Sequence, residues 1–333
     1  MSEVVLIQGD GIGPEISEAV VAILKAAGAD ITWVPATAGM TAYEQSGNPL
    51  PDDTITLIDK HRYALKGPLT TPVGKGFRSI NVGLRQRFQL YANIRPAKRF
   101  VGVHTPFPKV DLVMFRENTQ GLYSGIERWA NEAKTHAESI AVVTREASED
   151  IIRAAFDYAR QNSRRRVTLV HKANILKLTT GLFLDVGREI SAQYPEIEFE
   201  DIIIDNMAMQ MVIRPERFDV VVTTNLFGDI LSDLASGLVG GLGLTGSANI
   251  GRHHAIFEAV HGSAPDIAGQ GKANPTALLL SAVMMLEHLG QVDCARRIEA
   301  AVHRALADKI ICTPDVGGKG TTATYADAVI QLL

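Results

Sequence analysis

Residues 8–15 read QGDGIGPE and lie between an apolar run, VVLI, and a helix-like run, EISEAVVAILKAAG. A Rossmann enzyme binds the pyrophosphate of a dinucleotide at such a strand, glycine-rich turn and helix. The Rossmann fingerprint needs G-x-G-x-x-G, but the glycines here fall at positions 9, 11 and 13, and Pro14 takes the third fingerprint position. Asp30 has about the expected spacing for the acidic residue, but it precedes the next strand-like run, ITWVPA. The stretch therefore predicts a tight strand-to-helix turn and excludes a Rossmann fold, while cofactor contact by another geometry stays open.

Apolar runs rich in Val and Ile alternate with segments of helical period along the whole chain. This alternation predicts an α/β protein with large sheets. No repeat or low-complexity tract marks a domain boundary. The candidate strands are VVLIQ, ITWVPA, YALKG, DLVMFRE, SIAVVTRE, VTLVHK, FEDIIID, DVVVTTN and AIFEAVHG.

Length and charge bound the classes of partner. The chain has 333 residues and a net charge of −4, and its length is enough for two domains. The basic run RRR at 164–166 is short and typical of a solvated helix end, so we expect no nucleic-acid partner. The longest apolar run, TALLLSAVMML at 276–286, is too short to span a bilayer, so we expect no membrane partner.

The cysteines and the first residues bear on the compartment. Cys294 and Cys312 have no metal-binding or redox spacing, which favours a reducing compartment. No signal or transit segment fits the first residues. We therefore expect a cytoplasmic protein, or one of the mitochondrial matrix if the chain is a processed eukaryotic one.

Three carboxylates follow the ends of predicted strands. Asp205 ends the run IIID, and Asp229 and Asp233 lie four residues apart in the helix-like stretch after DVVVTTN. Open α/β sheets bind ligands where strands end and helices begin. Oxygen ligands suit Mg²⁺ or Mn²⁺. The alternative is that Asp205 and Asp229 are helix N-caps.

Arginines and polar side chains predict an anion site. Asn81 and Arg85 lie four apart on one helix face, and Ser79 lies near the start of that helix. Arg95 lies in an extended X-Pro dipeptide, and Arg116 ends the run DLVMFRE. Arginine grips carboxylates in a bidentate fork, so with a divalent cation the set indicates a small polycarboxylate substrate. Surface arginines and a serine N-cap are the alternative.

Two side chains are candidate proton carriers. Tyr123 lies in the loop-like stretch ENTQGLYSG, and Lys172 follows the strand VTLVH together with Asn174. A lysine beside a cation and arginines can serve in proton transfer. The alternatives are a packed loop aromatic and a solvated lysine.

Taken together, these stretches resemble the β-decarboxylating 2-hydroxyacid dehydrogenases, the family of isocitrate, isopropylmalate and homoisocitrate dehydrogenases. The resemblance covers nearly the whole chain and keeps the order of the family's motifs. The matching motifs are GDGIGPE, LKGPLTTP, RENTQGLYSG, HKANILK, NLFGDILSD, HGSAPDIAGQGKANPTA and TPDVGGKGTT. One departure is Gln120, where the family often has a glutamate.

The resemblance implies a two-domain α/β fold that is not a Rossmann fold. The large domain would comprise about 1–97 and 241–333 on the cofactor side, and the small domain about 98–240 with the dimer contacts and metal ligands. The substrate site would lie between the domains and be completed by the neighbouring subunit, which contributes Lys172 and Asp205. A homodimer or higher homo-oligomer with shared active sites is therefore expected.

The resemblance also assigns roles. The substrate contacts are Ser79, Asn81, Arg85, Arg95, Arg116 and Asn174, the three arginines forming the carboxylate clamp. The Mg²⁺ or Mn²⁺ ligands are Asp205, Asp229 and Asp233. Lys172 would help to remove the hydroxyl proton, and Tyr123 would protonate the enolate left by loss of CO₂.

Members of the family differ in the residues that meet the third substituent of the malate core, and these residues indicate the substrate. Ser79 and Asn81 can hydrogen-bond a third carboxylate, whereas an isopropyl group would leave them unpaired at about 1–3 kcal/mol each. We therefore expect oxidative decarboxylation of isocitrate, a small tricarboxylate, to 2-oxoglutarate and CO₂ through metal-bound oxalosuccinate. Homoisocitrate and isopropylmalate are the alternative substrates. A non-catalytic regulatory subunit is the other alternative, although the chain keeps the catalytic residues.

The predicted cofactor is NAD. Relatives that use NADP tend to have a Lys-Tyr pair where this chain has Asp266 and Ile267, and a carboxylate there would repel a 2′-phosphate. The loop HGSAPDIAG would line the phosphates, Asn274 and Ile12 the adenine, and Thr70 the nicotinamide half. The expected cofactor residues are Ile12, Thr70, His261, Gly262, Ser263, Ala264, Asp266, Ile267 and Asn274.

Overall fold

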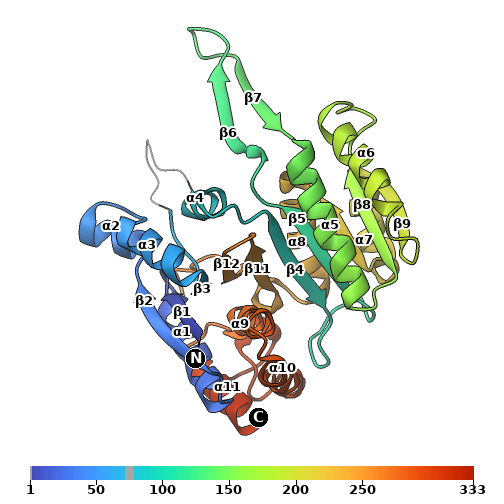
Figure 1. The fold of residues 1–333 in the computed structure, drawn as a ribbon. Coiled ribbons are helices and arrows are strands. Elements are labelled where there is room, and N and C mark those ends of the chain that lie inside the picture. The colour runs from blue at the N-terminus through green and yellow to red at the C-terminus, as the bar shows by residue number, and fades with distance from the viewer. Residues whose placement is uncertain (1, 72–78) are drawn as a thin grey trace. The chain divides into compact units, whose positions relative to one another are not determined.

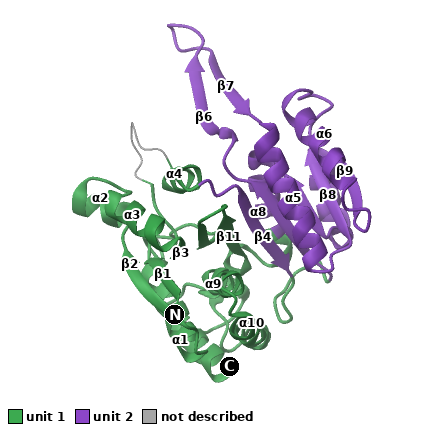
Figure 2. Cartoon of the chain, in the orientation of Figure 1, with its two compact units in different colours: residues 1–88, 99–108, 236–333 green, residues 89–98, 109–235 purple. Residues whose placement is uncertain are grey.

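A computed structural model describes residues 2–71 and 79–333, so Phe77 and Arg78 of the stretch FRSINVGLR lie outside the described residues. The chain forms two compact units, coloured green and purple in Figure 2. Unit 1 comprises residues 1–88, 99–108 and 236–333, and unit 2 comprises residues 89–98 and 109–235. The domain boundaries expected from the family resemblance stay a prediction.

Unit 1 is built on five strands in the order β2-β1-β3-β12-β11, and only the β11–β12 pair is antiparallel. Helix α9 packs on β3, β11 and β12, and α10 and α11 pack on each other (Figure 1). The strands are β1 (Ser2–Ile7), β2 (Ile31–Ala36), β3 (Tyr63–Lys66), β11 (Gly246–Ile250) and β12 (Ala255–Ala259). The helices are α1 (Gly13–Ala26), α2 (Met40–Ser46), α3 (Asp52–His61), α4 (Ile80–Arg87), α9 (Thr276–His288), α10 (Val292–Ala307) and α11 (Thr322–Gln331).

Unit 2 has strands in the order β4-β5-β10-β8-β9, antiparallel between β4 and β5 and parallel elsewhere, with a separate β6–β7 ribbon (Figure 1). Helices α5 and α6 pack on each other and on this sheet. The strands are β4 (Ala92–Lys98), β5 (Asp111–Glu117), β6 (Gly121–Trp129), β7 (Ala137–Val142), β8 (Arg166–His171), β9 (Glu198–Ile203) and β10 (Val220–Thr223). The helices are α5 (Arg145–Gln161), α6 (Thr179–Ser191), α7 (Ile204–Ile213) and α8 (Asn225–Val239), which continues into unit 1.

The sequence prediction of an α/β fold with large sheets is confirmed. The central strands are fully buried, and Val220, Val221 and Val222 of β10 each have 0% exposure, as expected for parallel strands covered on both faces. In 2–71 and 79–333, we find no helix that is both long and apolar enough to cross a membrane.

The turn at residues 8–15 has the predicted form. Strand β1 ends at Ile7, α1 begins at Gly13, and Pro14 occupies its first turn, where a missing N–H costs nothing. Gly9 has a φ of 82°, and a Cβ there would lie 2.2 Å from the carbonyl oxygen of Pro68. Asp30 precedes β2, so it lies at the opposite end of that strand from the one a Rossmann ribose contact requires.

Candidate active site

Two carboxylates lie one turn apart on α8 of unit 2. Asp229 and Asp233 have half-exposed side chains, at 37% and 55%. Because α8 begins at Asn225, Asp229 lies in its second turn and is not an N-cap. Asp205 is not an N-cap either, since the N-cap of α7 is Ile203. The alternative interpretation of these aspartates as helix caps is therefore wrong.

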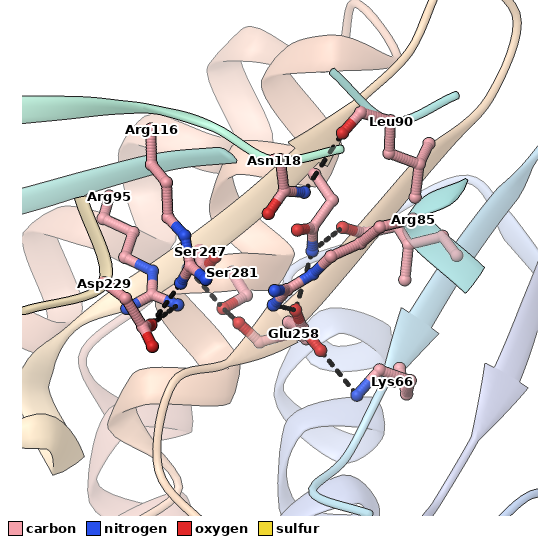
Figure 3. A network of polar contacts seen from close by, with 12 residues as sticks. Lys66, Arg85, Leu90, Arg95, Arg116, Asn118, Asp229, Ser247, Glu258 and Ser281 are labelled. Carbon is pink, nitrogen blue, oxygen red and sulfur yellow. Dashed lines mark hydrogen bonds and ion pairs between the residues drawn. The ribbon is translucent and has the colours of Figure 1, made fainter. Parts of the chain in front are cut away.

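Two buried arginines of neighbouring strands contact these carboxylates. Arg95 of β4 lies 3.3 Å from Asp233 and 3.9 Å from Asp229, and it donates to the hydroxyl of Ser232 at 2.6 Å. Arg116 of β5 donates through Nη1 to Asp229. Figure 3 shows both guanidinium groups pointing toward Asp229. These arginines are therefore not surface residues, since their side chains are only 7% and 1% exposed.

Tyr123 also contacts the carboxylate of Asp229. Its hydroxyl donates to Oδ2 of Asp229, and its ring lies beneath the Arg116 guanidinium at 5.1 Å. The residue belongs to strand β6, so the prediction of a loop was wrong. The prediction failed because the glycine and serine residues of GLYSG are typical of a turn. In the structure, the segment pairs with β7 and forms a strand with a register shift.

Lys172 and Asp205 contact each other in unit 2. Their side chains form an ion pair at 2.7 Å, and the hydrogen bond from Lys172 lowers the pKa of Asp205. Both groups are solvent-accessible, with Asp205 69% exposed. Asn174 is exposed in the loop that follows β8. Lys172 and Asp205 thus form an accessible ion pair on the surface of unit 2.

The donor set on α8 fits a divalent cation. Among residues 2–71 and 79–333, no three His, Cys, Asp or Glu side chains are grouped as a complete metal site. Burial raises the pKa of Asp233, and the nearby charge of Asp229 adds to this effect, although Arg95 opposes it. A cation would relieve the repulsion between the two carboxylates, which are oxygen ligands of the kind Mg²⁺ and Mn²⁺ prefer.

Arg85 of unit 1 belongs to a buried ion cluster. The Glu258 carboxylate accepts from Arg85 at 3.2 Å and from Lys66 at 2.6 Å (Figure 3). It also accepts from Asn249 at 2.8 Å. Burial by itself would raise the pKa of Glu258, but the charges of Lys66 and Arg85 outweigh burial and hold that pKa well below its usual range. Two cations and one carboxylate leave this group of three side chains with one excess positive charge.

The start of α4 presents polar side chains. Ser79 is the N-cap residue and is exposed, but its hydroxyl makes no capping hydrogen bond. Asn81 and Arg85 lie on α4 as predicted. The Oδ1 atom of Asn81 is buried and accepts no hydrogen bond within the part of the chain that the structure describes. An unsatisfied buried acceptor is costly, so this position favours a ligand that donates or a bridging water.

The turn at residues 8–15 is tied to other loops of unit 1 through Asp10. Its buried carboxylate accepts from the backbone N–H groups of Met40, Thr41 and Thr70, at 2.7–2.9 Å, and from the Thr41 hydroxyl at 2.8 Å. Gly39 is required beside it, because a Cβ at Gly39 would lie 2.0 Å from this carboxylate. Asp10 therefore holds this turn, the start of α2 and the Thr70 segment in one arrangement.

The same turn meets the loop HGSAPDIAG. The Ile12 N–H donates to the Ser263 carbonyl at 2.9 Å, and the hydroxyls of Ser263 and Thr70 share a hydrogen bond of 2.7 Å. A Cβ at Gly11 would lie 2.0 Å from the Ser263 carbonyl oxygen. Three predicted cofactor residues thus lie together, although they are up to 251 positions apart in the sequence, from 12 to 263.

Asn274 is held beside the same helix start. Glu15 of α1 accepts from the Ala273 N–H at 3.2 Å. The Asn274 amide donates to Asp315 at 2.9 Å and accepts from the Thr276 N–H at 3.0 Å. Asn274 is therefore already oriented by protein partners.

The remaining predicted cofactor residues line one exposed loop. Asp266 and Gly262 are exposed, and Ile267 is half-buried. Ala264 has a positive φ of 38°, which is uncommon for a residue with a side chain. Burial lowers the pKa of His261, and its Nε2 atom has no hydrogen-bond partner among the described residues. The neutral imidazole is therefore free to meet a ligand through this nitrogen.

Sequence reasoning missed several residues that support the site. Glu258 and Lys66 lie inside apolar strand runs, and a charge in such a run is the signal that could have identified them. Asp10 lies between two glycines in the sequence, and its carboxylate packs against Gly39. Glu117 is buried and accepts from the N–H groups of Thr119 and Gln120, and burial raises its pKa. Nothing in the sequence RENTQG indicates that this glutamate is buried.

The departure at Gln120 has a local explanation. Its side-chain amide exchanges hydrogen bonds with Thr144, the N-cap residue of α5, at 2.9–3.1 Å. The side chain thus joins the turn after β5 to the start of α5.

Comparison with known proteins identifies the family. The chain matches the family described as isocitrate/isopropylmalate dehydrogenase over residues 3–329. It is 51% identical to "Isocitrate dehydrogenase [NAD] subunit 2, mitochondrial" of Kluyveromyces lactis, over 98% of this chain and 89% of that protein. It is 50% identical to "Isocitrate/homoisocitrate dehydrogenase" of Thermus thermophilus, over 98% and 97% of the two chains. The crystal structure of isocitrate dehydrogenase from Methylococcus capsulatus superposes with a TM-score of 0.97, at 58% identity and coverage of 100% and 99%. The chain therefore belongs to the isocitrate/isopropylmalate dehydrogenase family.

Proposed function

We propose that this protein oxidatively decarboxylates isocitrate to 2-oxoglutarate and CO₂ with NAD as the hydride acceptor. The carrying observation is the cluster on unit 2, where two buried arginines and the Tyr123 hydroxyl meet the half-exposed carboxylates of α8. Family membership and the names of the similar proteins support the same reaction.

Asp229 and Asp233 would hold Mg²⁺ or Mn²⁺ together with Asp205, which we expect the neighbouring subunit to supply. When bound, the cation polarises the substrate oxygens as a Lewis acid, and NAD takes up the hydride from the carbinol carbon. Binding of a cation would also weaken the hold of the two carboxylates on Arg95 and Arg116.

Arg95 and Arg116 would then bind substrate carboxylates. Both guanidinium groups are buried and fixed by neighbouring side chains, so little side-chain entropy is lost when a carboxylate binds. Arg85 would bind a further carboxylate, which is supported by the excess positive charge of its cluster with Lys66 and Glu258. Three arginines suit a tricarboxylate better than a dicarboxylate with an apolar side chain.

Lys172 and Tyr123 would move the protons. Lys172 of a neighbouring subunit, in its neutral amine form, would accept the hydroxyl proton while the carbinol carbon is oxidised. The β-carboxylate then leaves as CO₂, and its bonding electrons form an enolate. Tyr123 would donate its phenolic proton to the enolate carbon, and its contact with Asp229 holds the hydroxyl beside the carboxylates.

The preference for NAD rests on the loop after β12. Asp266 is exposed there and would repel a 2′-phosphate while accepting from ribose hydroxyls. Ile12, Thr70 and Ser263 are joined by hydrogen bonds, which supports one preformed binding surface for the cofactor. His261 and Asn274 would complete this surface.

A homodimer or higher homo-oligomer is supported by exposed apolar side chains of unit 2. Trp129 of β6 is 55% exposed, Ile140 of β7 is 47% exposed, and Ile213 of α7 is 59% exposed. Large exposed apolar side chains are typical of protein interfaces. We propose that a second copy covers them, and light scattering on the purified chain tests this. A monomer at micromolar concentration would contradict it.

Homoisocitrate is a second candidate substrate, because the Thermus thermophilus protein carries both substrates in its name. Steady-state assays with isocitrate, homoisocitrate and isopropylmalate, each with NAD and NADP, separate the candidates. We expect isocitrate with NAD to have the highest kcat/KM. A higher value for either other substrate would overturn the substrate assignment and leave the family unchanged.

A further inference from the structure

Asn225 lies where the three elements that carry Arg116, Tyr123 and Asp229 meet. It is the first residue of α8, one turn before Asp229, and its side chain is 1% exposed. Its Oδ1 atom accepts from Nε of Arg116 at 2.9 Å, and its Nδ2 atom donates to the carbonyl oxygen of Gln120 at 3.0 Å. One buried amide thus links α8 to the end of β5 and to the turn that leads into β6.

The orientation of this amide has only one solution. The Nε–H of arginine is always a donor, and a backbone carbonyl is always an acceptor. Turning the Asn225 amide over would place its NH₂ against Arg116 and its oxygen against the Gln120 carbonyl. Both hydrogen bonds would be lost inside a buried site, so the asparagine is locked in the orientation described.

Close packing leaves little freedom around the amide. A Cβ at Gly121 would lie 3.4 Å from Cβ of Asn225, so the start of β6 lies directly against this side chain. A Cβ at Gly228 would lie 2.6 Å from the Arg116 side chain, so α8 packs on that arginine as well. Tyr123 follows two residues after Gly121 in the same strand, so only a short stretch of chain separates the Gln120 carbonyl from Tyr123.

We propose that Asn225 is a positioning residue of the reaction: it aligns the Tyr123 hydroxyl with Arg116 and Asp229 by holding the Arg116 guanidinium and the Gln120–Gly121 turn at the start of α8. The proposal rests on the function proposed above for Tyr123 and Arg116. Asn225 acts only through these groups and needs no contact with the substrate.

The two hydrogen bonds of Asn225 can be separated by substitution. Asn225→Asp keeps an acceptor for Arg116 but replaces the donor to Gln120 by an oxygen, which repels the carbonyl. We expect kcat to fall about 10²-fold, because displacements near 1 Å have effects of that size. The KM for isocitrate should change little, because Arg116 keeps its partner. Asn225→Ala removes both bonds and should also raise KM.

A double-mutant cycle tests whether Asn225 acts through Tyr123. In the Tyr123→Phe background, Asn225→Asp should cost only a few-fold in kcat, because the hydroxyl that it aligns is gone. Additive losses in the double variant would overturn the proposal. Asn162→Asp is the matched control: Asn162 is the exposed C-cap residue of α5, and its change should leave kcat unaltered.

A readout without turnover separates this proposal from the proposed function. The protein is labelled with 3-fluorotyrosine, and the ¹⁹F resonance of Tyr123 is assigned by its loss in Tyr123→Phe. Asn225→Asp should shift this resonance in the substrate-free protein, whereas Asn162→Asp should not. An unshifted resonance would overturn the positioning role even if the wild type is active. If the wild type turns over none of the three substrates, the proposed function fails, and the resonance still decides the positioning role.

The variant must be folded for these comparisons. Thermal unfolding and light scattering of Asn225→Asp should match those of the wild type within a few degrees. Should this variant fail to fold, Asn225→Ser gives a second variant, in which a shorter hydroxyl replaces the amide. The same kcat, double-mutant and ¹⁹F measurements then apply to it, with the same outcomes.

Discussion

The charged cluster of unit 1 and that of unit 2 are built in opposite ways. In unit 1, Glu258 is buried between Lys66 and Arg85, and all three side chains are less than one tenth exposed. In unit 2, Arg95 and Arg116 are equally buried, but their partners Asp229 and Asp233 are 37% and 55% exposed.

The difference shows which ion pairs can exchange partners. A carboxylate buried between two cations has no access to another ligand, so the Glu258 cluster is fixed and orients Arg85. Half-exposed carboxylates beside buried arginines can take up a cation from solvent and leave the arginines to a substrate. Loss of Glu258 is therefore expected to act mainly on stability, and loss of Asp229 or Asp233 mainly on activity.

The largest expected effect is on activity, in unit 2. Asp229→Asn removes one proposed cation ligand and the acceptor of Arg116 and Tyr123, so we expect kcat to fall about 10³-fold with the fold retained. Steady-state assays and circular dichroism check this. Asp185→Asn, on the exposed face of α6, is the control and should leave both kcat and the circular dichroism spectrum unchanged. Near-normal turnover by Asp229→Asn would remove the metal assignment.

The next effect is on stability, in unit 1. Glu258→Gln leaves Lys66 and Arg85 buried without their carboxylate, so the free energy of unfolding should fall by about 3–5 kcal/mol in urea titrations. The depressed pKa of Glu258 stabilises the fold above the unfolded-state pKa of about 4.3. The difference in the free energy of unfolding between the wild type and Glu258→Gln should therefore be constant from pH 8 to 6. It should shrink below pH 4.3. The exposed Glu18→Gln on α1 is the control, and an equal loss there would refute the buried cluster's role.

Cation binding should distinguish the two clusters directly. Mn²⁺ at about 100 times its Kd should stabilise the wild type by about 2.7 kcal/mol, and EDTA should reverse this. Asp233→Asn should lose the effect, and Glu258→Gln should keep it. Because the pKa of Asp233 is raised, its carboxylate binds a proton more readily as pH falls, so the stabilisation by Mn²⁺ should weaken at acid pH. Calorimetry at several pH values measures this; a Mn²⁺ effect that survives in Asp233→Asn would place the cation elsewhere.

Cofactor preference should change through one exposed loop of unit 1. The double substitution Asp266→Lys with Ile267→Tyr removes a charge that would repel a 2′-phosphate and supplies partners for it. We expect the ratio of kcat/KM for NADP over NAD to rise about 10²-fold. Asp293→Lys, an equal change of charge at an exposed position of α10, should leave the ratio as it is. An unchanged ratio in the double variant would show that discrimination lies outside this loop.

The smallest expected effect concerns the start of α4. Asn81→Leu removes the side-chain amide, whose Nδ2 group is the donor that a third carboxylate would need, so the KM for isocitrate should rise about tenfold, with a smaller change for isopropylmalate. Asn81→Ser retains a hydrogen-bonding group, so its KM for isocitrate should lie between those of the wild type and Asn81→Leu. Equal KM changes for both substrates would mean that Asn81 does not select the substrate.

The elements and most candidate residues could be predicted from local signals. The alternation of apolar runs predicted most of the strands but not β4, β6 or β11. The four-residue spacing placed Asp229 and Asp233 on one helix face, as the structure confirms. Long motifs gave the family before any geometry was known. These signals depend on short stretches, which a sequence displays directly.

The supporting residues could not be predicted, because their partners are distant in the sequence. Glu258 is 173 residues from Arg85, and Asn225 is 109 residues from Arg116, so no spacing rule connects them. Strand β6 was missed because its glycines resemble a turn, and only its pairing with β7 makes it a strand. The roles of Asp205 and Lys172 in a neighbouring subunit stay a prediction.

The most direct test of the account is a product balance on the purified chain alone. With Mn²⁺, NAD and limiting isocitrate, we expect NADH, CO₂ and 2-oxoglutarate in equal amounts, and none of them after EDTA treatment. That result would assign catalysis to this chain and to the cation-dependent cluster on α8. No NADH without a second kind of subunit would show a regulatory chain, and full turnover in EDTA would contradict the cation site.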